Sequence, residues 1–189
     1  ELQAAMKSVD VLRFEADISI QFTEPTSKDL VVEQIGWLHL TWFASEDYVG
    51  RRGLCRRYED LPDHHIVEQE TDQLKSYGLD NLFGPGSTDR MVRLKTNFSS
   101  AHYWAVAKGV GIGLLPNYAQ LIGARVVYMP TGWVYPVKIF MAVHPDIARS
   151  SRHRHFMEWI RRAFSSERYP WFGKDFIPPD KLQSTPLPR

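Results

Sequence analysis

The stretch RLKTNFSSAHYWAVAKGVGIGLLPNY, Arg93 to Tyr118, decides the fold. Its first residues suit a short strand. The side-chain oxygens of Asn97, Ser99 and Ser100 can then accept hydrogen bonds from the free N–H groups that open a helix. The glycines between residues 109 and 113 end that helix, and the apolar residues after them are expected to be buried. The sequence therefore predicts a strand, a helix that starts near Ser99 or Ser100, and a buried turn.

The predicted helix start is a candidate anion site. Unpaired N–H groups and the helix macrodipole point outward together at a helix N-terminus, which favours a negative charge there. Capping alone, with no ligand, is the alternative interpretation. The glycine run 109–113 does not form a dinucleotide-binding loop, because it follows a helix, whereas that fingerprint follows a strand and opens a helix.

This stretch resembles the effector-binding domain of LysR-type transcriptional regulators, whose chains carry a polar strand end, a helix and a G-x-G-I-x-x-L-P-x-Y-like turn. Three further matches follow the order of that family: EADISI at 15–20, WFAS at 42–45 with Tyr48, and YEDL at 58–61. The resemblance covers roughly residues 9 to 172. It implies an α/β fold of two Rossmann-like lobes joined by two crossover strands, like type 2 periplasmic solute-binding proteins. The first strand and helix of lobe one are expected to be absent.

The resemblance also implies a division of the chain. We expect the first part of lobe one at 1–40, lobe two at 41–128, the return part of lobe one at 129–168, and an irregular C-terminal tail at 169–189. Residues Leu30–Val32 and Ile35–Phe43 are rich in β-branched and aromatic side chains and are predicted to be two strands, the second crossing between lobes. Residues Val126–Met129 are predicted to be the return crossing.

Nine residues are predicted to bind a ligand between the lobes: Gln21, Phe22, Thr23, Gln69, Glu70, Thr71, Asn97, Ser99 and Ser100. Residues 21–23 follow a strand, and ligands of open α/β sheets bind at the carboxyl edge. Residues 69–71 match where the second lobe of the family offers groups to the cleft, although an ordinary polar strand exit is the alternative. Donors at a helix start favour an anion, and the Phe22 ring can cover a carbon skeleton, so we expect a carboxylated metabolite.

The composition excludes several classes of protein. The 189 residues carry a net charge of +1 and are 43% hydrophobic, as in soluble globular proteins, and no apolar run is long enough to span a membrane. Cys55 is the only cysteine, which excludes an intrachain disulfide and fits a reduced, cytoplasmic compartment. Because four arginines flank it between residues 51 and 57, its thiol pKa could be lowered. Trp37 and Trp42 are interpreted as core or hinge packing.

No catalytic motif is present: the sequence lacks a G-x-S-x-G elbow, an H-E-x-x-H helix and a Cys/His metal quartet. We therefore expect neither an enzyme nor a cofactor or metal. The resemblance implies a sensor in which a small-molecule effector changes DNA binding through an N-terminal helix-turn-helix absent from this chain, as a homodimer or homotetramer without a membrane partner. The alternative is a solute-binding protein of a transport system. The upstream sequence separates the two, since a helix-turn-helix supports the regulator and a signal peptide the transporter.

Overall fold

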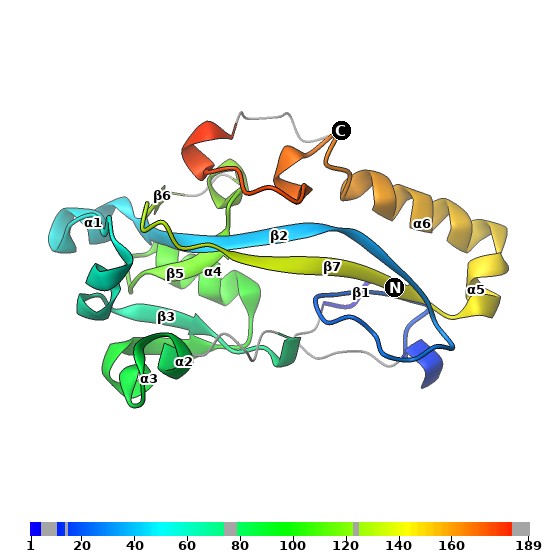
Figure 1. Ribbon diagram of the computed structural model, residues 1–189, viewed down its shortest axis with the longest axis horizontal. Helices are drawn as coiled ribbons and strands as arrows, with labels where there is room; N and C mark the ends of the chain where they lie inside the picture. Colours follow the sequence, from blue (N-terminus) through cyan, green and yellow to red (C-terminus); the bar gives the residue numbers. More distant parts are fainter. Residues whose placement is uncertain (5–10, 14, 74–78, 123–124, 183–189) are drawn as a thin grey trace.

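Two long antiparallel strands, β2 (Val31–Ser45) and β7 (Tyr135–Val143), run through the computed structural model and join its two lobes (Figure 1). The structure describes residues 1–4, 11–13, 15–73, 79–122 and 125–182. The two strands pair from Val31 opposite Val143 to Leu40 opposite Tyr135. The second half of β2, from Leu38 onward, is buried on both faces. The pair therefore forms the interior of the molecule as well as the connection between its lobes.

Both crossings differ in detail from the sequence prediction. β2 is one continuous strand where two were predicted. Its pairing with β7 shifts register between Gln34 and Gly36, near the predicted boundary of the two strands. The prediction of Val126–Met129 as the return crossing was wrong: β6 (Val126–Tyr128) pairs with Phe43–Ser45 at the far end of β2, and β7 makes the return. A three-residue strand spans only about 10 Å, which is too short to cross between lobes.

Lobe one contains β1 (Ile18–Gln21), α5 (Pro145–Arg149) and α6 (Ser151–Ala163), at the right-hand end of Figure 1. β1 pairs with β7 in antiparallel register, and all strand pairs described in this lobe are antiparallel. Met157 and Ile160 of α6 pack against β7. Among the described residues no strand precedes β1, and no parallel strand pair is found in this lobe.

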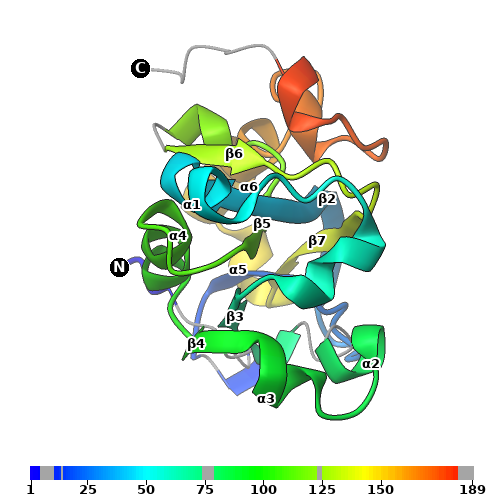
Figure 2. The same ribbon diagram turned by 90° about the vertical axis from the view of Figure 1, so that its left-hand side faces the viewer.

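Lobe two holds the parallel pair of the fold, β3 (Ile66–Gln69) and β4 (Val92–Thr96). Figure 2 looks at this end of the molecule, with α2 and α3 beside β3 and β4, and with α1 and β6 on the opposite side. The other elements are α1 (Glu46–Arg52), α2 (Leu79–Phe83), α3 (Ser87–Met91), α4 (Ser99–Ala107) and β5 (Gly113–Pro116). Short 3-10 turns occupy Val11–Arg13, Tyr58–Asp63, Ala119–Ile122, Pro170–Phe172 and Pro179–Lys181.

The glycine turn after α4 carries the chain back into the sheet. Gly109 has a φ of 77°, which a residue with a side chain rarely adopts. Ile112 then bonds to β3 in both directions: its N–H donates to His65 O at 2.8 Å, and its carbonyl accepts from Val67 N–H at 2.8 Å. A Cβ on Gly111 would lie 2.5 Å from His65 O. A side chain at position 111 would therefore clash with the backbone at His65, and only glycine fits there.

The described part of the C-terminal region, 169–182, contains no α-helix or strand but packs closely on β2. Tyr169 and Trp171 are buried, and the Trp171 ring lies 5.6 Å from that of Tyr118. A Cβ on Gly36 would lie 3.3 Å from Phe172 O, so the strand and this segment are in contact. The stretch is irregular in secondary structure, as its prolines led us to expect, and aromatic side chains pack it on the rest of the fold.

The close approach at Gly111 generates a stability prediction. Gly111→Ala should lower the free energy of unfolding by about 2 to 3 kcal/mol, because the new methyl group displaces the β3 backbone. Gly50→Ala is the matched control: nothing lies within 4 Å of its Cβ position inside α1, and helix propensity should raise stability by about 0.5 to 1 kcal/mol. Urea denaturation measures both. Equal stability of Gly111→Ala and wild type would contradict the packing described here.

Candidate functional site

A cavity of about 420 Å³ lies where the lobes meet. Its floor is the face of β2 that carries Leu38, Leu40 and Trp42, with Leu114 of the neighbouring strand β5 opposite Trp42. β3 and the start of α4 form one wall, and Figure 1 shows these elements on the same side of β2. Phe22 contributes a ring from lobe one. The cavity therefore draws on both lobes and on the strand between them.

Five of the nine residues predicted from the sequence line this cavity: Phe22, Gln69, Thr71, Ser99 and Ser100. Four do not. Gln21 is buried within β1, and Thr23 and Asn97 are exposed outside the lining. The Glu70 N–H donates to Thr96 O at 2.9 Å and continues the β3–β4 pair. Because side chains alternate along an extended chain, Glu70 faces away when Gln69 and Thr71 face the cavity. Ligand binding by these residues stays a prediction.

A contact between lobes closes one side of the cavity. The Phe22 N–H donates to Oε1 of Gln73 at 2.6 Å, and the Thr23 hydroxyl makes a longer contact of 3.5 Å with the Gln73 carbonyl. Phe22 and Thr23 follow β1 in lobe one, whereas Gln73 follows β3 in lobe two. The loop 22–23 is thus fastened to the opposite lobe beside the cavity.

α4 begins at Ser99, as the sequence predicts, but its capping differs. The N-cap residue is Phe98, which provides no side-chain hydrogen bond. The Ser99 hydroxyl oxygen instead accepts a hydrogen bond from Nε2 of Gln69 at 2.8 Å. The prediction that Asn97, Ser99 or Ser100 caps the helix was wrong, because the two serines already lie in its first turn. The side chain of the N-cap residue Phe98 thus provides no cap, and Ser99 and Ser100 of the first turn line the cavity.

His102 lines the cavity and was missed by the sequence analysis. It is 2% exposed, and its Nε2 lies 3.0 Å from Val67 O. Burial lowers its pKa, although the bond to Val67 opposes this, so the ring is neutral at physiological pH. A Cβ on Gly113 would lie 3.0 Å from that nitrogen. The signal that could have found His102 is its spacing of three residues from Ser99, which places both on one side of the helix.

Three aromatic residues of the lining carry polar atoms: Trp42, Tyr103 and Tyr118. Trp42 is 1% exposed and packs against Trp133 with ring centroids 5.9 Å apart, in keeping with its interpretation as core. Its indole N–H has no acceptor among the described residues. Burial raises the pKa of Tyr118 to about 12, so its phenol stays neutral. These aromatic side chains add area to an apolar floor without adding charge.

The lining is poor in charge. Its only ionisable carboxylate among the described residues is Glu68, whose Oε2 lies 3.2 Å from Nζ of Lys95. No described lysine or arginine lines the cavity. A ligand with several negative charges would lose its hydration without gaining a cation in return. The cavity therefore suits an apolar molecule with one anionic or polar group.

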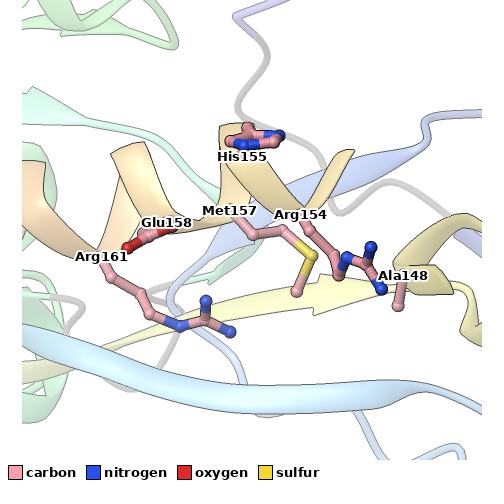
Figure 3. A pocket seen from close by; sticks show the side chains of 6 residues that line it. All are labelled: Ala148, Arg154, His155, Met157, Glu158 and Arg161. Atoms are coloured by element: carbon pink, nitrogen blue, oxygen red, sulfur yellow. The ribbon is translucent and has the colours of Figure 1, made fainter. Parts of the chain in front are cut away.

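A second hollow of about 510 Å³ runs along α5 and α6 in lobe one (Figure 3). Arg154, Met157 and Arg161 point from α6 toward the sheet, whereas His155 points away. Arg161 is already held by Glu33 through Nε and Nη2, at 2.9 and 2.8 Å. The polar side chains of this hollow do not converge on one point. The cavity between the lobes is therefore the candidate site.

The thiol of Cys55 does not offer a reactive alternative. Burial raises its pKa to about 11, and Asp60 adds to the rise, so the prediction of a lowered pKa was wrong. Within the described part of the chain, no three His, Cys, Asp or Glu residues are placed to hold a metal ion. None of the described helices is long and apolar enough to cross a membrane.

Together, two α/β lobes, two crossing strands and a cavity at their junction define a domain of the periplasmic-binding-protein-like class. The family model for the LysR substrate binding domain matches residues 1–165, and the chain belongs to this family. No curated protein matches the sequence significantly.

Solved structures of similar fold include regulatory domains of transcriptional regulators of the LysR type. The CrgA regulatory domain of Neisseria meningitidis is 15% identical with a TM-score of 0.66, and the match covers 81% of this chain and 78% of that one. The CcmR regulatory domain of Synechocystis PCC6803, solved in complex with 2-PG, is 19% identical with a TM-score of 0.61, over 81% and 76%. Full-length AphB of Vibrio cholerae is 17% identical with a TM-score of 0.60, over 82% and 53%. The chain thus spans about half of that full-length regulator.

Proposed function

We propose that this chain is the ligand-sensing domain of a cytoplasmic LysR-type transcriptional regulator, not an enzyme. It binds a small carboxylated metabolite between its lobes and thereby modulates DNA binding and transcription by the full-length protein. The observation that carries the proposal is the apolar cavity that ends at the first turn of α4, where Ser99 and Ser100 line it. The CcmR domain of similar fold, solved with 2-PG, supports a small molecule as the ligand class.

A carboxylate fits this cavity better than a cation. Helix N–H groups donate to an anion, and the macrodipole adds roughly half a positive charge at the N-terminus. Glu68 is paired with Lys95, so it does not offer a free carboxylate to a cationic ligand. The apolar floor formed by Leu38, Leu40 and Trp42 takes the carbon skeleton. One acidic group at one end of an apolar body matches both parts of the lining.

The position of the cavity explains how binding would reach the DNA-binding part. A ligand on β2 touches the strand that joins the lobes, together with Phe22 from lobe one and Ser100 from lobe two. It therefore stabilises one angle between the lobes over others, in proportion to its differential affinity for them. The contact of the loop 22–23 with Gln73 is the bond that changes with this angle.

Removal of the Ser100 hydroxyl tests the site. Ser100→Ala should weaken binding of a carboxylate found by thermal-shift screening roughly five- to thirtyfold, the value of one lost hydrogen bond of 1 to 2 kcal/mol. Stability should change by less than about 0.5 kcal/mol, because Ser100 is not the cap. Calorimetry and denaturation measure the two quantities. Ser151→Ala, in the first turn of α6, is the matched control and should bind normally.

Ser99→Ala is a less clean variant, since it also removes the acceptor for Gln69 and should lose stability. Unchanged affinity in both Ser99→Ala and Ser100→Ala would show that the ligand binds elsewhere.

We also propose that the regulator is a homodimer or homotetramer in which α6 contributes to the interface. Phe156 and Trp159 stack with ring centroids 5.5 Å apart, and they remain 46% and 56% exposed. Two large stacked rings on one helix face are typical of association surfaces. A second copy of the chain is the partner that the family suggests.

Light scattering tests this association. Phe156→Ser with Trp159→Ser should convert the dimer of the chain to monomer, because the apolar area that drives the contact is lost. Trp104→Ser is the control, since Trp104 of α4 is 58% exposed in lobe two. A wild-type monomer at every concentration, or a dimer that survives the double substitution, would refute the proposed interface.

A further inference from the structure

His102 has a nitrogen that its structural role leaves unused. A carbonyl oxygen only accepts hydrogen bonds, so the 3.0 Å contact with Val67 O requires that Nε2 carries the proton. The neutral ring then has a bare lone pair on Nδ1. No described residue donates a hydrogen bond to Nδ1. The contact with Val67 thus fixes the tautomer and leaves one acceptor in a residue that is 2% exposed.

The cavity is where a partner can reach this acceptor. His39 and His153 each have a buried Nδ1 with no hydrogen-bond partner among the described residues. His102 differs because it is one of the lining residues of the cavity. It also lies three residues after Ser99, about 4.5 Å along the axis of α4. The lone pair therefore stands one helical turn from the donors at the start of that helix.

We propose that Nδ1 of His102 accepts a hydrogen bond from the bound effector, so that the effector carries a neutral O–H or N–H donor about one helical turn from its carboxylate. The inference rests on the proposed function, because it takes the carboxylate to lie at the first turn of α4. It adds the second polar group of the ligand. The class of molecule is a hydroxylated or amidated monoacid with an apolar body.

The surroundings of His102 select against a second acid group at this point. A lone pair repels a carboxylate, and the contact of Nε2 with Val67 O keeps this lone pair on Nδ1. A diacid would place its second charge beside the lone pair. The site thus selects ligands that carry a hydrogen-bond donor at this point over ligands that lack one. Such selection is strong in a buried site, because a ligand without the donor leaves the acceptor unpaired.

Calorimetry with paired probes tests the proposal. The pairs are 3-hydroxybenzoate with 3-fluorobenzoate, and 3-hydroxybutanoate with 3-fluorobutanoate; within each pair size and charge match, and only the donor differs. The wild-type chain should bind the hydroxy member of at least one pair roughly five- to thirtyfold more tightly. His102→Gln keeps an N–H for Val67 O but lacks the lone pair at Nδ1. In this variant the preference should fall below about twofold.

Tyr103→Phe is the matched control, since Tyr103 lines the same cavity and the substitution removes a hydroxyl while leaving His102. It should keep the preference. Three results would each overturn the role of His102 while leaving the carboxylate proposal intact. They are equal binding of both members by the wild type, a preference that survives in His102→Gln, and loss of the preference in Tyr103→Phe. Failure of all four probes to bind the wild type would overturn the carboxylate proposal and this inference with it.

A measurement on the wild-type chain covers the case in which His102→Gln does not fold. In the ¹⁵N spectrum of histidine-labelled protein, the unprotonated Nδ1 resonance of a buried histidine should move on addition of the bound hydroxy acid and not of its fluoro partner. No movement with a bound hydroxy acid would overturn the proposal.

Discussion

The antiparallel ladder between β2 and β7 is the constraint on which the two lobes depend. Its pairs run from Val31 opposite Val143 to Leu40 opposite Tyr135, so the same hydrogen bonds hold lobe one together and attach it to lobe two. Past Leu40, β2 continues into lobe two, where β5 and β6 pair with it. Two paired antiparallel strands can bend together but cannot slide along each other without breaking the ladder, which favours hinge motion over shear.

The cavity uses this connection as its floor. A molecule that packs on Leu38, Leu40 and Trp42 contacts the hinge strand itself. Specificity in such an apolar cavity comes from a small number of polar groups. In our proposal the two groups that bind the effector's polar atoms belong to one helix: the first turn of α4 and the ring of His102 one turn later. Gly113 makes room for that ring, which links the glycine turn of the sequence to the chemistry of the site.

The sequence predicted the parts of the fold that local signals determine. The start of α4 at Ser99 and the glycine turn after it follow from residue types at fixed spacing, and they placed Ser99 and Ser100 on the cavity. The return crossing was missed because the pairing of Val137 with Leu38 is a contact across about a hundred residues, which no local pattern reveals. His102 was missed because its spacing of three residues from Ser99 is a weak signal, and the partner that fixes its tautomer, Val67 O, lies on another element of the fold.

Hydrogen–deuterium exchange with and without a bound carboxylate tests most directly whether the ligand lies on the hinge strand at the start of α4. Exchange should slow at the amides of residues 99–102 and at Phe22, on the two sides of the cavity. The helices α5 and α6 should exchange as in the free protein. Protection confined to α5 and α6, with residues 99–102 unchanged, would contradict the account.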